Sequence, residues 1–169
     1  MILVAVVASL AGRTARADPA TLGVDAVGVA PVGAYSDVST AAFGADARIA
    51  YPVTSSVAAI GRVGYVQDAN QMAGFSMSIV PVLVGARVRL GASHVFVDAE
   101  LGASVITESG MGTSLTNARF GFQLGAGYQA GKLEAKLGYW VPGSEDLGNG
   151  RDSTLGGVVA SVGYDFIAL

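Results

Sequence analysis

The feature that most constrains this fold is the strict alternation of apolar and polar residues in GKLEAKLGYW, residues 131–140. Side chains on a β-strand point alternately to opposite faces, whereas in a helix this spacing would scatter the charges around the axis. As a strand, the segment has one face of Leu133, Ala135, Leu137 and Tyr139. Its other face carries Glu134, Lys136, Gly138 and Trp140. The segment is therefore predicted to be a strand with an apolar face and a charged face.

The same alternation recurs along the chain. The eight alternating segments are residues 22–30, 43–51, 57–65, 79–90, 95–105, 119–128, 133–141 and 154–166. Most are close to the roughly 9–11 residues that a tilted strand needs to cross a bilayer. The chain is 51% hydrophobic and only 14% charged, yet no apolar run approaches the roughly 18 residues of a membrane-spanning helix. The apolar residues are thus distributed periodically, which favours an all-β fold.

The connections between these segments alternate in length. Short turns are expected at residues 52–56, 91–94 and 129–132, and longer polar loops at residues 31–42, 66–78, 106–118 and 142–153. An even number of strands with short turns at one end and long loops at the other is typical of outer-membrane proteins. The sequence therefore predicts an eight-stranded antiparallel up-and-down transmembrane β-barrel. Two prolines within or beside strands, Pro31 and Pro81, are expected to mark bulges or strand ends.

One face of the predicted strands collects charge, and the opposite face carries none. The charged residues on that face are Asp25, Asp46, Arg48, Arg62, Arg87, Arg89, Asp98, Glu100, Arg119, Glu134, Lys136 and Asp165. Across the hairpin between segments 79–90 and 95–105, the pair Arg87 and Arg89 is expected to neutralise Asp98 and Glu100. Together the twelve residues form a predicted charge network in the barrel lumen.

Periodicity alone leaves two architectures open, a membrane barrel with charges inside and a soluble lipid-binding barrel with an apolar cavity. Three features favour the membrane barrel. Glycines interleave with the charges, as a narrow eight-stranded interior requires, and six acids balance six bases. The third feature is a set of aromatic residues near the strand ends, expected at the membrane interfaces: Phe43, Tyr51, Tyr65, Phe120, Tyr128, Tyr139, Tyr164 and Phe166. Turning six cations toward lipid would cost roughly 12–24 kcal/mol at most, against a total stability of about 5–15 kcal/mol.

The first seventeen residues differ from the rest. Twelve apolar residues, too few to span a bilayer as a helix, precede Ala15-Arg16-Ala17, an A-x-A cleavage pattern. Residues 1–17 are therefore predicted to be a secretory signal peptide, with an N-terminal strand as the alternative. Residues 18–169 form the single barrel domain.

The order and spacing of several segments resemble the OmpA/OmpX-like eight-stranded outer-membrane β-barrels of Gram-negative bacteria. The segments concerned are PVLVGARVRLG (81–91), VFVDAELGA (95–103), GFQLGAGYQAGKLEAKLGYW (121–140) and VASVGYDF (159–166). The resemblance implies a location in the bacterial outer membrane, a monomer with a plugged interior, and contact with outer-membrane lipid and lipopolysaccharide. It also implies handling by the barrel assembly machinery, which in this family reads a terminal aromatic, here Phe166 or Tyr164. Members are structural, adhesive or defensive proteins, and a few modify lipid A.

No motif in the sequence indicates catalysis, a cofactor or a zinc site. The only histidine, His94, lies in a predicted short turn, whereas the lipid A-modifying barrels use a histidine near the outer rim, so no catalytic residue is assigned. The net charge of −3 and the absence of a basic cluster argue against nucleic acid as a partner. Acids in the long loops suggest divalent-cation bridges to lipopolysaccharide phosphates: Asp37, Asp68, Glu108, Glu145, Asp146 and Asp152.

The sequence thus predicts a non-enzymatic outer-membrane barrel with a structural or surface-interaction role. A small pore is the first alternative, followed by a lipid A-modifying enzyme and a soluble lipid-binding barrel.

Overall fold

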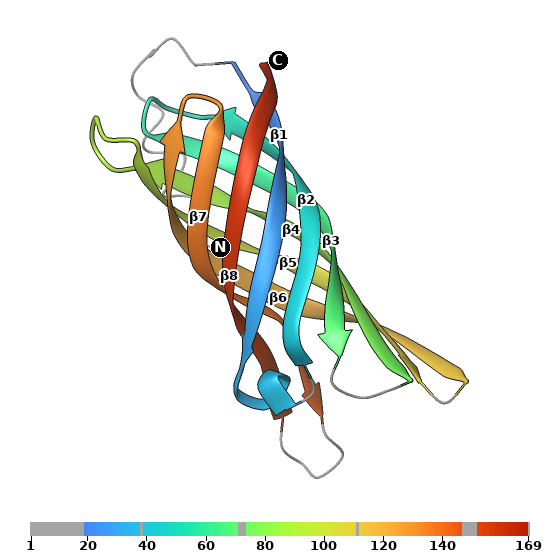
Figure 1. Ribbon diagram of the computed structural model, residues 1–169. Coiled ribbons are helices and arrows are strands. Elements are labelled where there is room, and N and C mark those ends of the chain that lie inside the picture. The colour runs from blue at the N-terminus through green and yellow to red at the C-terminus, as the bar shows by residue number, and fades with distance from the viewer. Residues whose placement is uncertain (1–18, 38, 71–73, 111, 147–151, 169) are drawn as a thin grey trace.

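The chain forms a closed antiparallel barrel of eight strands in sequence order, in which β1 also pairs with β8 (Figure 1). The computed structural model describes residues 19–37, 39–70, 74–110, 112–146 and 152–168. The strands are β1 Thr21–Val32, β2 Ser39–Pro52, β3 Val57–Asn70, β4 Phe75–Arg89, β5 Val95–Gly110, β6 Thr113–Ala130, β7 Leu133–Asp146 and β8 Asp152–Ala168. A short 3-10 helix, η1 (Gly33–Asp37), follows β1. The predicted fold class is confirmed, whereas the predicted signal peptide lies outside the described residues.

The two ends of the barrel differ. The end that we call the turn end carries the connections 53–56, 90–94 and 131–132, together with the end of β8. The opposite end, called the far end, carries η1 and the other three connections. Tight turns at both ends use glycine in the left-handed region, with φ of 62° at Gly131 and 79° at Gly112. Such angles strain any residue that has a Cβ atom.

The prediction of long loops at the far end is wrong, because the strands continue into the polar segments. β5 and β6 pair as far as Gly110 and Thr113, and their hairpin protrudes beyond the rest of the barrel (Figure 1). Cross-strand hydroxyl contacts accompany this extension, at 3.2 Å between Thr107 Oγ1 and Thr116 Oγ1. Backbone pairing therefore extends past the point where apolar alternation ends, since threonine and serine also suit a strand that water surrounds.

Neither proline that the sequence singles out forms a bulge. Pro31 pairs with Gly157 of β8 beyond the last rung between β1 and β2, so it lies at an end of that ladder. At Pro81 the ladder with β3 lacks two rungs but resumes in the same register. A register shift falls instead at another proline, Pro142, between Trp140 and Gly143 of β7. The missing amide donor is thus accommodated by an interrupted ladder at one proline and by a shifted register at another.

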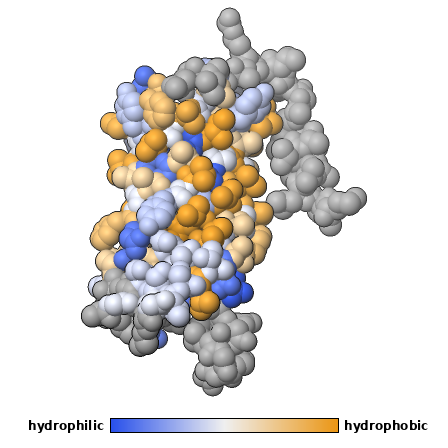
Figure 2. All heavy atoms as spheres, turned by 90° about the vertical axis from the view of Figure 1, so that its right-hand side faces the viewer, coloured by the Kyte–Doolittle hydropathy of each residue, from blue (hydrophilic) through white to orange (hydrophobic). Residues whose placement is uncertain are grey.

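The outer wall of the barrel is apolar. Large hydrophobic side chains are exposed on every strand, from Phe43 at 61% on β2 to Phe120 at 69% on β6 and Val162 at 62% on β8. Figure 2 shows apolar residues spread across the middle of the wall on one side of the molecule. In the described part of the chain, no helix has the length and apolar character needed to cross a membrane.

The inward-facing side chains form two layers. The half nearer the turn end holds buried charged residues. The half nearer the far end is filled by apolar side chains that form one buried cluster: Val27, Val29, Tyr35, Ala42, Val66, Met77, Ile79, Ile106, Trp140, Leu155 and Val159. Side chains thus fill both halves of the interior, as expected for a barrel of only eight strands.

Candidate functional site: the charged interior of the barrel

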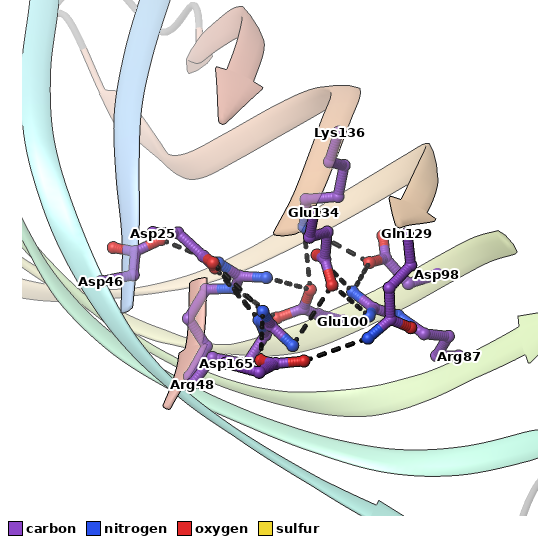
Figure 3. Close-up of polar contacts among 11 residues, drawn as sticks. Asp25, Asp46, Arg48, Arg87, Asp98, Glu100, Gln129, Glu134, Lys136 and Asp165 are labelled. Atoms are coloured by element: carbon purple, nitrogen blue, oxygen red, sulfur yellow. Dashed lines mark hydrogen bonds and ion pairs between the residues drawn. The ribbon is translucent and has the colours of Figure 1, made fainter. Parts of the chain in front are cut away.

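Eight buried charged residues of the turn-end half form a closed ring in which acids and bases alternate (Figure 3). We call this set the ionic ring. Its members, in order of contact, are Asp25, Arg62, Glu100, Lys136, Asp98, Arg87, Glu134 and Arg48, with Arg48 returning to Asp25. They come from β1, β2, β3, β4, β5 and β7, so the ring ties together six of the eight strands.

The contacts within the ionic ring lie between 2.5 and 3.4 Å. The pair of Arg87 and Glu134 is bidentate, with Nη1 at 2.5 Å from Oε2 and Nη2 at 2.7 Å from Oε1. Such a planar pair between arginine and a carboxylate fixes geometry as well as charge. Arg87 also lies over the ring of Phe96, 3.6 Å from its centroid. These contacts hold the arginine in one orientation from both sides.

Two further aspartates attach to the ionic ring. Asp46 accepts from Nη1 of Arg62 at 3.1 Å, and Asp165 accepts from Nη2 of Arg48 at 3.0 Å. Asp165 also accepts a hydrogen bond from Nε2 of Gln129 on β6 at 3.0 Å. With these additions, side chains from all eight strands meet in one polar assembly. Removing Arg62 would leave the buried carboxylate of Asp46 without a cation, which costs far more than losing an exposed pair.

Two of the twelve residues predicted for the lumen network do not join it. Arg89 is on the inward face of β4 but is exposed at the turn end, and no described acid lies within ion-pair distance of it. Arg119 is partly exposed in the far-end half, where its buried Nε has no hydrogen-bond partner among the described residues. The expected pairing across the β4–β5 hairpin holds only for Arg87 and Asp98, at 3.3 Å. The assembly therefore has six acids and four bases.

Glycines opposite the aspartates make room for the carboxylates. Asp25 pairs with Gly163, Asp46 with Gly64, Asp98 with Gly125 and Asp165 with Gly23 on neighbouring strands. At each of these glycines an added Cβ would fall within 3.0 Å of the aspartate Oδ1, closer than real Cβ contacts allow. The interleaving of glycine with charge in the sequence thus corresponds to physical pairs of one long and one absent side chain.

The 3-10 helix η1 covers the apolar layer at the far end, and its Tyr35 is part of that layer. Tyr35 of η1 is fully buried, and its hydroxyl donates to Oδ1 of Asp68 at 3.2 Å. Ser39 also donates to this carboxylate, whose other oxygen has no partner among the described residues. Burial is the main cause that raises the pKa of Tyr35 above its usual value, and the negative charge of Asp68 adds to it. The sequence did not predict this contact, because η1 carries no periodic signal.

The structure places His94 among the turns, away from any acid–base arrangement. Its ring lies against Tyr128 with centroids 5.5 Å apart, and the neighbouring Ser93 hydroxyl donates to the carbonyl of Leu90 at 2.5 Å. Among the described residues there is also no group of three or more His, Cys, Asp or Glu side chains that could hold a metal ion. The eight predicted interfacial aromatics all point outward and are between 41% and 69% exposed.

The protein is similar to known proteins in its structure but not detectably in its sequence. No protein-family model and no curated protein matches the sequence. Ail, the attachment invasion locus protein of Yersinia pestis, aligns with a TM-score of 0.57 at 15% identity over 89% of this chain and 98% of its own. The N-terminal β-barrel domain of Pseudomonas aeruginosa OprF aligns with a TM-score of 0.55 at 15% identity, over 89% of this chain and 100% of its own.

Neisserial surface protein A gives a TM-score of 0.53 at 17% identity, over 90% of this chain and 100% of its own. At such low identity the likeness concerns the backbone and the strand order, not particular residues. The chain therefore has the fold of the eight-stranded outer-membrane β-barrels of the OmpA/OmpX type.

Proposed function

We propose that this protein is a plugged barrel of the bacterial outer membrane with a structural or surface-interaction role. The observation that carries the proposal is the inversion of polarity between wall and interior. The ionic ring is buried, with Arg48 and Asp25 each only 1% exposed, while Leu137 and Val162 on the wall are 61% and 62% exposed. In water this arrangement would desolvate charges and leave apolar surface wet. In lipid the apolar wall is favourable, and the interior is a less costly place for the charges than the hydrocarbon.

The outward aromatics support the same orientation. Tyr51, Tyr128 and Tyr164 lie near the turn end of their strands, whereas Phe43 and Phe120 lie nearer the far end. Aromatic side chains favour the two membrane–water interfaces, so these residues would form the two girdles of a membrane barrel. The turn end would then face the periplasm and the far end the outside. Outer-membrane lipid and lipopolysaccharide are the proposed surroundings, and the barrel assembly machinery is the proposed insertion route.

The filled interior favours a plugged barrel over the alternative of a small pore. Solutes entering from the turn end would meet the ionic ring, in which each cation contacts at least two acids. Beyond it lies the apolar layer, where Met77, Ile79 and Ile106 are at most 2% exposed. An ion crossing that layer would lose its hydration with few polar groups to replace it. We therefore expect planar bilayers containing the protein to show no single-channel conductance.

A non-enzymatic role fits the side chains of the barrel better than lipid A modification. His94 is at the turn end, and Ser93 bonds to a turn carbonyl, so neither supports a nucleophile with a base. Lipid A deacylation and acyl-transfer assays would test this, with no turnover as the expected result.

A surface-interaction role is supported by the β5–β6 hairpin. Residues 113–121 of β6 pair with β5, but the ladder between β6 and β7 begins only at Phe122. Residues 112–118 are all exposed and contain neither lysine nor proline, residues that commonly protect a free strand edge. This edge and the acids of the far end are the proposed contact surfaces, the latter through divalent cations and lipopolysaccharide. Asp68 is removed from that set of acids, because it is buried and accepts hydrogen bonds from Tyr35 and Ser39.

The deciding experiment is refolding from urea into detergent or lipid vesicles, followed by gels of unboiled and boiled samples. The proposal expects a faster-running unboiled band and strands that resist added protease. Folding in plain buffer without detergent would contradict it and would favour a soluble barrel with an apolar cavity.

A further inference from the structure

The turn end contains a polar cavity that the proposed function does not use. It has a volume of about 580 Å³ and is lined mainly by the three turns, with Ser55, Ser56, Arg89, Ser93, His94 and Gln129 as its polar members. A smaller cavity of about 50 Å³ adjoins it, shares Ser55, Ser56 and Arg89, and reaches Arg87 of the ionic ring. Neither cavity is lined by a described aspartate or glutamate. The lining of the larger cavity thus offers hydroxyl, imidazole and amide groups and one guanidinium, that of Arg89, while Nε2 of Gln129 already donates to Asp165.

Arg89 is the cation of this site that lacks a partner. Arg87, two residues away on the same face of β4, already binds Glu134 and Asp98. Its buried Nε nevertheless has no hydrogen-bond partner among the described residues. Arg89, at the mouth, lies beyond ion-pair distance of every described carboxylate, including those of the ionic ring. A guanidinium with an unused fork of donors is suited to bind an oxyanion.

The level of the cavity in the barrel indicates where such an anion would come from. Ser55 and Ser56 follow the end of β2 by a few residues, and Tyr51 on the same strand is 63% exposed on the outer wall. Gln129 stands beside Tyr128 near the end of β6. If these tyrosines mark a membrane interface, the cavity lies at the depth of lipid headgroups. Free phosphate would reach the same opening from solution.

We propose that this turn-end cavity binds a phosphate group, with Arg89 as its anchor and the serine hydroxyls, His94 and Gln129 as further contacts. The phosphate is either inorganic phosphate or the headgroup of an anionic phospholipid. The binding of phosphate itself does not depend on the proposed function, because the cavity is built by the turns alone. Only the lipid source requires the barrel to stand in a membrane.

The test is calorimetric titration of inorganic phosphate into the full chain, folded in a detergent without phosphate. Saturable binding is expected for the wild type, and binding about tenfold weaker for Arg89→Gln, as loss of one charge-assisted contact implies. Arg89→Lys, which keeps the charge but loses the fork, should bind with intermediate affinity. Lys132→Gln is the matched control, since Lys132 is an exposed turn cation that does not line the cavity, and it should bind like the wild type.

A second arm separates the two sources. The titration is repeated in vesicles of phosphatidylcholine alone and with added phosphatidylglycerol, and loss of phosphate binding only in the latter identifies the headgroup as the occupant. Unchanged binding there identifies free phosphate. The proposal is overturned if phosphate does not saturate, if Arg89→Gln binds as tightly as the wild type, or if acetate binds better than phosphate. Failure of the barrel to insert into vesicles would contradict the proposed function but leave the detergent titration intact.

Discussion

Asp25 and Gly163 face each other across the junction of β1 and β8, and the aspartate Oδ1 fills the space that a Cβ atom on Gly163 would need. The same carboxylate binds Arg48 and Arg62, so this junction closes the barrel and also anchors the ionic ring. Backbone pairing and ion pairing thus constrain each other at one point. A side chain at position 163 would therefore displace the Asp25 carboxylate and disturb its ion pairs.

Gly163→Ala is therefore expected to destabilise the barrel by about 1–3 kcal/mol, the usual cost of overpacking a filled interior. Gly28→Ala is the matched control, because nothing lies within 4 Å of a Cβ added at Gly28 on the same strand pair. Urea unfolding in detergent micelles would measure both free energies of unfolding. Equal midpoints for the two variants would contradict the proposed role of the space at Gly163.

Arg62→Met is expected to cost more. Arg62 contacts Asp25, Asp46 and Glu100 and is the only described cation within ion-pair distance of Asp46, so its removal leaves one buried carboxylate unpaired, at about 3–5 kcal/mol. Arg89→Gln, which removes a cation from the same inward face but outside the ionic ring, should leave the urea midpoint near that of the wild type. If Arg62→Met unfolds no earlier than Arg89→Gln, the ionic ring does not stabilise the barrel.

The sequence predicted correctly that the charged side chains point inward, but it predicted less well which residues they contact. Alternation places Glu134 and Lys136 on one face, and the balance of charges, the glycines and the aromatic residues assign that face to the interior, where the structure finds both buried. Alternation cannot give the position of a side chain along the barrel axis. For this reason Arg89 was assigned to the charge network, although it lies at the open turn end. Nor can alternation give contacts across the lumen. Arg62 on β3 reaches Glu100 on β5 because the wall curves around a narrow interior.

The far end was predicted less well for a related reason. Strand limits were drawn where apolar alternation stopped, but β5 and β6 continue in register through exposed serine and threonine. Where a strand is polar on both faces, alternation of apolar and polar residues is absent and cannot show where the strand ends. Its end is then determined by backbone pairing alone. The apolar layer was missed in part because Met77 lies between Ser76 and Ser78 in residues 66–78, which were predicted to form a polar loop.

Alkaline titration should identify Tyr35 as the last tyrosine to ionise. Its raised pKa means that folding is unaffected below the unfolded value of about 10 and is progressively destabilised above it, as the unfolded chain loses the phenolic proton first. Ionisation would also set a phenolate against the Asp68 carboxylate. We expect Tyr35→Phe to remove the final step in phenolate absorbance. Tyr65→Phe, at an exposed tyrosine, should retain that step, and its loss there would contradict the assignment.

The protruding hairpin is expected to be dispensable for folding. Ile106 and Asn117 are directly paired, so residues 107–116 can be replaced by Asn-Gly, the sequence preferred in a two-residue hairpin turn. Residues 112–116 of the removed segment are exposed, and the hydrogen bonds from Ser109 to Ser114 and from Thr113 to Gly110 are made within it. The shortened chain should therefore keep its heat-modifiable band and its urea midpoint in micelles. A large fall in the midpoint would show that the hairpin supports the barrel, and would weaken its assignment as a contact surface.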